Sequence, residues 1–157
     1  MVEQKTNAMR ILDKAKIGYE PIFYECDEFV DAVSASEHSG TPPELTYKTI
    51  IVQGKSERYY AVVVPSEKEI DLKKAAKAVG EKSVEPIHVK DINRITGYVR
   101  GGCSPLGIKR RCDVIIDASI MKYEQIFISG GRLGCSLRLD PKDLVRVSSA
   151  TVEDVVL

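Results

Sequence analysis

The sequence predicts a mixed α/β fold: a single domain over residues 1–157, with a mixed, partly barrel-like β-sheet and flanking helices. The chain has 157 residues, a length typical of one domain with a substantial hydrophobic core. Segments with helical periodicity and apolar segments typical of strands follow one another along the chain. Their order lacks the regular strand–helix–strand alternation of a parallel sheet, which favours a mixed sheet.

Helices are expected where apolar residues recur at three- and four-residue spacing next to a capping residue. In the first helix, apolar residues between Ala8 and Ala15 share a face, and Gly18 stands where a C-terminal cap belongs. A later helix ends in the same way before Gly80. The expected helices cover residues 6–16, 31–38, 71–79, 91–96 and 141–145.

Strands are expected where short apolar segments are bounded by Gly, Pro, Ser or Asn. The clearest pair covers residues 46–53 and 59–65, and the Gly-Lys-Ser-Glu segment between them predicts a hairpin loop. The other expected strands cover residues 21–25, 84–89, 113–116, 125–129 and 135–139.

The composition indicates a cytoplasmic protein that has no contact with membranes. No apolar run approaches the roughly 18 residues of a membrane helix, and the N-terminus has no apolar signal core. The four cysteines form no C-x-x-C pair, and only His38 and His88 could join them as ligands. We therefore expect neither a metal nor a cofactor.

The charges balance overall, but they are unevenly distributed. The chain has 23 basic and 23 acidic residues, yet residues 19–45 contain seven acids and no Lys or Arg. Residues 100–111 show the reverse, with no acid and four basic residues: Arg100, Lys109, Arg110 and Arg111. Such a cluster suits a phosphate-bearing ligand, although a solvated turn would have the same composition.

The basic cluster overlaps a glycine-rich loop over residues 97–107, which contains four glycines, one proline and Ser104. Glycines at this density let a ligand approach main-chain N–H groups directly. Their spacing fits neither the P-loop nor the dinucleotide-binding fingerprint. Ser104 is not in a G-x-S-x-G elbow, so it is interpreted as a turn residue or a hydrogen-bond donor.

Two further residues are candidates for chemistry. Lys48 stands at the start of an apolar strand, where its ammonium could extend to water or point into a cleft and pair with a carbonyl, carboxylate or phosphate. Cys103 lies inside the glycine-rich loop but has no histidine nearby in sequence to act as its base. We interpret Cys103 as a bystander.

The sequence resembles the YbaK-type aminoacyl-tRNA deacylases, relatives of the prolyl-tRNA synthetase editing domain. The resemblance rests on T-Y-K-T-I-I-V from residue 46, on L-K-K-A-A-K from residue 72 and on I-S-G-G from residue 128. The match to G-Y-x-x-G-G-x-S-P-x-G from residue 97 is specific. The resemblance covers nearly the whole chain in order.

This resemblance implies removal of a wrong amino acid from tRNA, with Cys-tRNA(Pro) as the typical substrate. In the family the lysine that matches Lys48 is the essential side chain, and the glycine that matches Gly101 contributes backbone contacts. Tyr24, Phe29 and Ser129 match positions that line the pocket. From these implications we predict that the N–H groups of Gly101 and Gly102 hold the ester carbonyl.

The remaining candidate residues are predicted to contact the substrate or the tRNA. Ser104, Gly130 and Gly131 are predicted to bind the substrate. The predicted contacts to the tRNA acceptor end come from five basic residues: Arg100, Lys109, Arg110, Arg111 and Arg132. Two departures from the family pattern stand out, because Leu133 replaces a basic residue and Cys26 stands where the family often has histidine.

The expected function is substrate-assisted cleavage, in which the thiol of a cysteinyl substrate attacks its own ester. The partners are the acceptor end of aminoacyl-tRNA and, as a further candidate, prolyl-tRNA synthetase. Two alternatives stay open. One is water-mediated cleavage of another small aminoacyl ester, alanyl or seryl, and the other is a non-catalytic module that binds tRNA ends or the synthetase.

Overall fold

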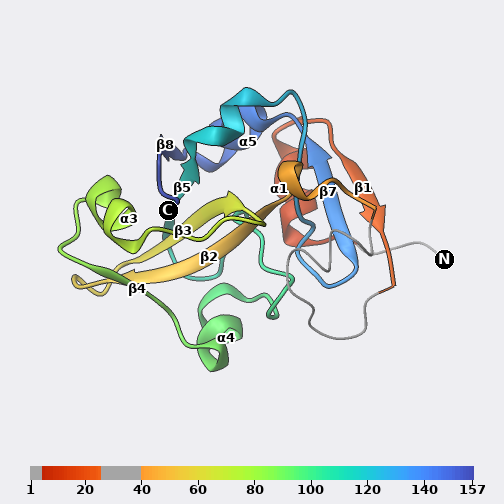
Figure 1. Cartoon of the computed structure of the whole chain (residues 1–157). Coiled ribbons are helices and arrows are strands. Elements are labelled where there is room, and N and C mark those ends of the chain that lie inside the picture. Colours follow the sequence, from red (N-terminus) through yellow and green to blue (C-terminus); the bar gives the residue numbers. More distant parts are fainter. Residues whose placement is uncertain (1–4, 26–39) are drawn as a thin grey trace.

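The computed structural model describes residues 5–25 and 40–157, which contain α-helices, short 3-10 helices (η) and two β-sheets (Figure 1). The strands are β1 (Glu20–Phe23), β2 (Tyr47–Gly54), β3 (Tyr59–Pro65), β4 (Val84–Pro86), β5 (Cys112–Asp117), β6 (Ile126–Ser129), β7 (Cys135–Leu139) and β8 (Thr151–Glu153). The helices are α1 (Asn7–Lys14), η1 (Pro43–Leu45), α3 (Leu72–Val79), η2 (Val89–Asp91), α4 (Ile92–Thr96), η3 (Ala118–Lys122) and α5 (Pro141–Ser148).

The strands form one five-stranded sheet, ordered β4–β2–β3–β5–β8, and one three-stranded sheet, ordered β1–β7–β6. The larger sheet is mixed, because β2 is antiparallel to β3 and β4 whereas β5 is parallel to β3 and β8. The predicted mixed α/β fold is therefore confirmed. Its partly barrel-like character is not, because neither sheet closes on itself within the described residues.

The short strand β4 leaves part of β2 without a neighbouring strand. It pairs only with the end of β2, from Val52 to Gly54. On that side the stretch from Lys48 to Ile50 has no paired strand among the residues the structure describes. An open strand edge of this kind leaves room for a ligand beside the sheet, as the site below shows.

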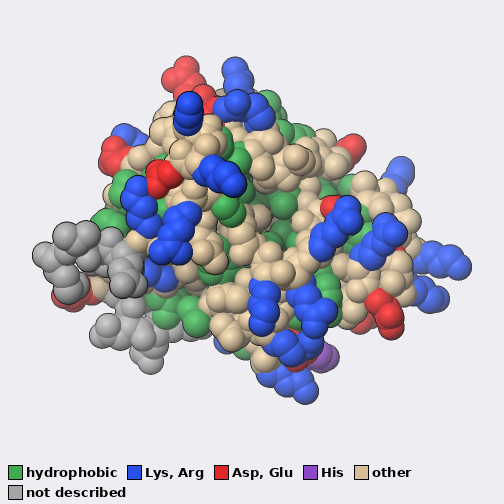
Figure 2. All heavy atoms as spheres, turned by 180° about the vertical axis from the view of Figure 1, so that it is seen from behind, with side chains coloured by type: hydrophobic (Ala, Val, Ile, Leu, Met, Phe, Trp, Pro, Cys, Tyr) green, Lys and Arg blue, Asp and Glu red, His purple; other side chains and the backbone are tan. Residues whose placement is uncertain are grey.

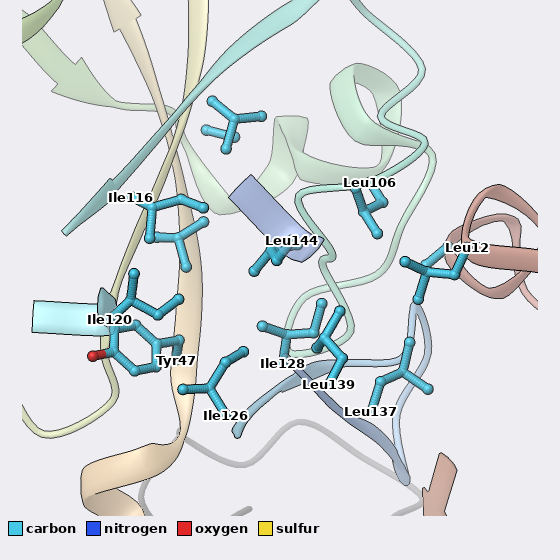
Figure 3. Close-up of a cluster of buried hydrophobic side chains, with 14 of the residues drawn as sticks. Leu12, Tyr47, Leu106, Ile116, Ile120, Ile126, Ile128, Leu137, Leu139 and Leu144 are labelled. Carbon is cyan, nitrogen blue, oxygen red and sulfur yellow. The ribbon is translucent and has the colours of Figure 1, made fainter. Parts of the chain in front are cut away.

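Apolar side chains cover both faces of the five-stranded sheet. On one face α3 packs Ala75 and Ala76 against Val52 and Val62. On the other face lies the larger core, in which α1, α4, α5 and the three-stranded sheet all take part. Figure 3 shows this core converging from several elements, with labelled side chains that include Leu12, Tyr47, Ile116, Ile128, Leu137 and Leu144.

Several helices begin at the capping residues visible in the sequence. The Asp71 carboxylate accepts hydrogen bonds from the N–H groups of Lys73 and Lys74, which fixes the first turn of α3. In α1, Thr6 caps the N-terminus, but the expected cap at Gly18 is wrong. The helix ends at Lys14, so Gly18 lies beyond its C-terminus.

Other boundaries differ from those expected. Helix α5 runs to Ser148, three residues further than predicted, and the short strand β8 was not predicted at all. The expected helix over residues 31–38 lies outside the described residues. None of the helices in the described part is long and apolar enough to cross a membrane.

Candidate functional site

The glycine-rich loop over residues 97–107 is held by the end of α4 and by its own tyrosine. The Thr96 hydroxyl donates to the Ile92 carbonyl at 2.7 Å and accepts from the Tyr98 N–H at 3.0 Å. The Tyr98 hydroxyl then donates across the loop to the Leu106 carbonyl. Burial raises the pKa of Tyr98 to about 12, so this donor keeps its proton.

The second glycine cluster, residues 129–134, packs directly against this loop. A Cβ on Gly102 would stand 2.9 Å from the Cα of Arg132, and one on Gly131 would stand 3.1 Å from the Tyr98 ring. The Thr6 hydroxyl donates to the Gly130 carbonyl at 2.5 Å, which ties the cluster to the start of α1. Two segments about thirty residues apart in sequence thus form one wall because glycine permits close backbone approach.

A cavity of about 600 Å³ lies between this wall, the open edge of β2 and the β6–β7 hairpin. Its volume falls within the roughly 300–1,000 Å³ of small-molecule sites. Of the predicted site residues, five line it: Tyr24, Lys48, Arg100, Gly101 and Ser129. The sequence therefore located a real cavity, although the chemical role of each residue stays a prediction.

Lys48 brings a positive charge to the cavity. It lies near the start of β2, opposite Val64, and is half-buried. Its ammonium forms no hydrogen bond or ion pair with any residue that the structure describes. Lys48 therefore lines the cavity, and the direction in which its ammonium points stays a prediction.

Gly101 and Gly102, predicted to act together, differ in what their N–H groups do. Gly101 lines the cavity with φ +85°, a left-handed conformation that favours glycine, and its N–H has no acceptor in the described part of the chain. The Gly102 N–H instead donates to the Val99 carbonyl at 2.9 Å. The Gly102 donor is thus used within the loop, and its role in holding the ester carbonyl stays a prediction.

Ser104, Gly130 and Gly131 were predicted to bind the substrate, but none of them is among the residues that line the cavity. Ser104 is fully buried, and its hydroxyl accepts from the Leu106 N–H at 3.1 Å, which agrees with its interpretation as a turn residue. The Gly130 N–H donates to the Cys135 carbonyl at 2.8 Å. These three residues belong to the two segments of the wall but do not line the cavity.

Ser129 and Tyr24 belong to the three-stranded sheet and its extension. Ser129 pairs with Ser136 across the β6–β7 hairpin, and its hydroxyl accepts from the Gly131 N–H at 3.2 Å. The hydroxyl can still donate its own proton to a ligand. The Tyr24 N–H donates to the Gly134 carbonyl, which fixes the chain where Tyr24 lines the cavity. Phe29 and Cys26 lie outside the described residues.

The predicted tRNA contacts are exposed, with one exception. Lys109, Arg110 and Arg111 project from the segment that leads into β5. Arg132 is half-buried, with its guanidinium 5.5 Å from the centre of the Phe23 ring. Figure 2 shows that Lys and Arg side chains predominate over Asp and Glu on the face opposite to that of Figure 1. Such a surface suits a polyanion, although no single basic residue is thereby assigned to tRNA.

The sequence missed other residues that line the cavity. Glu69 is the one acid among the described lining residues, and Pro86 and Ile87 close one side. Ser136 could have been anticipated only from the hairpin register that sets it opposite Ser129. Cys103 also lines the cavity, but burial raises the pKa of its thiol to about 12, so it carries no thiolate near neutral pH.

Comparison with known proteins identifies the class to which this fold and cavity belong. The family model described as "Aminoacyl-tRNA editing domain" matches residues 27–147, so the chain belongs to the aminoacyl-tRNA editing domain family. This membership confirms both the family expected from the sequence and the expected class of enzyme, an aminoacyl-tRNA deacylase.

Individual relatives support the assignment. The chain is 34% identical over 154 residues to the "Putative Cys-tRNA(Pro)/Cys-tRNA(Cys) deacylase EbsC" of Enterococcus faecalis, with 98% of this chain and 94% of the relative covered. It is 25% identical over 118 residues to the uncharacterized protein YwhH of Bacillus subtilis, with 75% of this chain and 74% of the relative covered.

Solved structures show the same fold. The "hypothetical protein APE2540" superimposes with a TM-score of 0.87 at 21% identity, covering 97% of this chain and 100% of that one. A "putative trans-editing enzyme for prolyl tRNA synthetase" gives a TM-score of 0.83 at 21% identity, covering 99% of each chain. At this level of identity the likeness establishes the fold alone.

Proposed function

We propose that this chain is a trans-editing deacylase that removes cysteine from Cys-tRNA(Pro) by substrate-assisted cleavage of the ester. The observation that carries the proposal is the character of the cavity. It offers the Lys48 ammonium and the Gly101 N–H, while the described residues around it include no histidine and no activated nucleophile. The name of the E. faecalis relative supports cysteine as the amino acid.

In this reaction the nucleophile is the thiol of the substrate itself. The cysteinyl thiol loses its proton, and its sulfur attacks the ester carbonyl carbon to form a C–S bond. The C–O bond to the terminal ribose then breaks, and the ribose oxygen takes up a proton. The products are tRNA and a cysteine thiolactone, which water opens to free cysteine. Holding sulfur and carbonyl close together replaces the separate nucleophile that most hydrolases supply.

The cavity residues would stabilise charge along this path. The Gly101 N–H would hold the developing oxyanion, and a single such donor is worth about 3–4 kcal/mol in other enzymes. The Lys48 ammonium would favour the thiolate and orient the ester end or terminal phosphate. The exposed Lys109, Arg110 and Arg111 would contact the acceptor stem.

A panel of charged tRNAs tests the proposal. The protein is assayed on Cys-, Ala-, Ser- and Pro-tRNA, and on Cys-tRNA whose thiol has been alkylated. We expect rapid cleavage of Cys-tRNA and none of the alkylated form. Cleavage of the alkylated form, or of Ala-tRNA at a comparable rate, would instead establish water-mediated hydrolysis.

Substitution of Lys48 separates an enzyme from a binding module. We expect Lys48→Ala to lower kcat/KM for Cys-tRNA roughly 100-fold, the scale of losing one electrostatic contact to a reacting carbonyl. The matched control is Lys73→Ala, because Lys73 is exposed on α3 and does not line the cavity. Normal deacylation by Lys48→Ala would rule out the assigned role.

A further inference from the structure

A second cavity adjoins the first and has not been given a role so far. Its volume is about 390 Å³, and it shares Pro86 and Ile87 with the proposed editing cavity. Tyr59 and Ile95 contribute to its lining, and both pack into the larger hydrophobic core. The segment that joins β4 to α4 therefore forms a common wall between the two cavities.

Strand β2 passes both cavities in succession. Lys48 to Ile51 line the editing cavity, while Gln53 and Gly54 line the second one. Two residues of a strand span about 7 Å, which is comparable to one step along an extended nucleotide chain. Because the nearest lining residues on β2, Ile51 and Gln53, are two positions apart, a nucleic-acid end whose last residue lies in the editing cavity would place the residue before it beside the second cavity.

The second cavity is lined by groups that suit a nucleotide rather than an apolar ligand. Lys55, His88 and Arg94 supply donors and positive charge, whereas Glu85 and Asp91 supply carboxylates. The Asp91 carboxylate lies 3.3 Å from the Arg94 guanidinium, which orients that group. The Glu85 carboxylate accepts no hydrogen bond from the part of the chain that the structure describes, so it is available as an acceptor.

This combination matches the edge of cytosine. Its exocyclic amino group donates to a carboxylate, while its ring nitrogen and carbonyl oxygen accept from basic side chains. Single-stranded RNA ends are recognised through such base edges, with basic side chains on the phosphates. In every tRNA the nucleotide before the terminal adenosine is a cytidine.

We propose that the second cavity binds this penultimate cytidine, with Glu85 accepting from its amino group and Lys55 and Arg94 contacting its phosphate or base. The inference rests on the proposed function, because it assumes that the terminal aminoacyl-adenosine occupies the editing cavity. It adds a subsite that recognises the tRNA end independently of the amino acid.

A series of short substrates tests the subsite. Deacylation above the spontaneous rate is measured for cysteinyl-adenosine, for cysteinyl-CpA and for cysteinyl-UpA. We expect kcat/KM to rise about tenfold or more from cysteinyl-adenosine to cysteinyl-CpA, the usual scale for one well-placed base contact. Cysteinyl-UpA should gain less, because uracil presents an oxygen where cytosine presents the amino group.

Two variants test different contacts in the second cavity, one made by its basic side chains and one made by Glu85. The double variant Lys55→Ala/Arg94→Ala should lose most of the gain from the added nucleotide. Glu85→Gln should abolish the preference for CpA over UpA, because the glutamine amide can donate to the uracil oxygen. The matched control is Lys73→Ala/Lys77→Ala, which removes the same charge from exposed positions on α3. Cleavage of cysteinyl-adenosine reports whether each variant is folded.

The outcomes separate this inference from the proposed function. If the protein cleaves none of the substrates and no Cys-tRNA, the proposed function itself fails. If it cleaves Cys-tRNA but cysteinyl-CpA is no better than cysteinyl-adenosine, the subsite is overturned and the editing function stands. A gain from CpA that survives in both cavity variants overturns the subsite as well.

Discussion

At the scale of single residues, the proposed editing cavity is distinguished by two hydrogen-bond donors that have no acceptor among the described residues. Lys48 and Gly101 both line a site whose described lining contains one acid, Glu69. Charge and hydrogen-bonding capacity are thus available where an ester carbonyl or a phosphate would lie. The neighbouring Gly102, one residue away, has already used its N–H within the loop. Position along the sequence is therefore a poor guide to which donor is free.

Replacement of Cys103 tests whether the cavity supplies its own nucleophile. Cys103 lines the cavity, but its thiol stays protonated because burial raises its pKa to about 12. We expect Cys103→Ala to keep kcat for Cys-tRNA within about threefold, since a protonated thiol is a poor nucleophile. Single-turnover deacylation of the variant checks this. A hundredfold loss would identify Cys103 as a participant in the reaction.

At the scale of elements, two glycine-containing loops function as one wall. The loop after α4 and the loop between β6 and β7 touch at Gly102 and Arg132, and Tyr98 supports both from within. The wall sets the distance between Gly101 and the hairpin residue Ser129. Any substitution that separates the loops should therefore both widen the cavity and lower the free energy of unfolding.

Gly102→Ala tests this close packing. Its Cβ would stand 2.9 Å from the Arg132 Cα, a backbone atom that cannot easily move aside. We expect the variant to unfold with about 1–3 kcal/mol less free energy, the usual cost of overpacking, and to lose deacylation. Gly18→Ala is the control, because a Cβ there meets nothing within 4 Å. Urea unfolding compares the two, and equal stability would mean that the loops separate at little cost.

The elements also show what the sequence could predict. The paired strands β2 and β3 and the helix α3 follow from local periodicity and from caps such as Asp71, so they were found nearly at their observed bounds. Lys48 and Gly101 were located through motifs. By contrast, the close approach of Gly102 to Arg132 and the hydrogen bond from Thr6 to Gly130 join segments far apart in sequence, which no local pattern encodes.

At the scale of the whole molecule, burial keeps two thiols and two phenols in their neutral forms. Burial raises the pKa values of Cys103, Tyr47 and Tyr98 to about 12 and that of Cys112 to about 11. The packing of the interior therefore disfavours ionisation of these thiols and phenols. Because burial shifts all four pKa values upward, the free energy of unfolding depends on pH in the alkaline range.

The sign of that linkage follows from the direction of the shifts. Above about pH 8.5 the unfolded chain loses its cysteine protons, whereas the folded chain keeps those of Cys103 and Cys112. The folded state then binds more protons than the unfolded state, so the free energy of unfolding falls as pH rises. Each group lowers it by up to about 1.4 kcal/mol per pH unit, and the buried tyrosines add to this above about pH 10.

Urea unfolding between pH 7.5 and pH 10, under reducing conditions, measures this slope. We expect the urea midpoint to fall steadily above about pH 8.5 in the parent protein. The double variant Cys103→Ala/Cys112→Ala should be less stable at pH 7.5, because two packed side chains are truncated, but its midpoint should fall less steeply. If the urea midpoints of the two proteins fall in parallel as pH rises, the thiols ionise as readily in the folded state as in the unfolded chain. Water would then reach Cys103 and Cys112 in the folded protein.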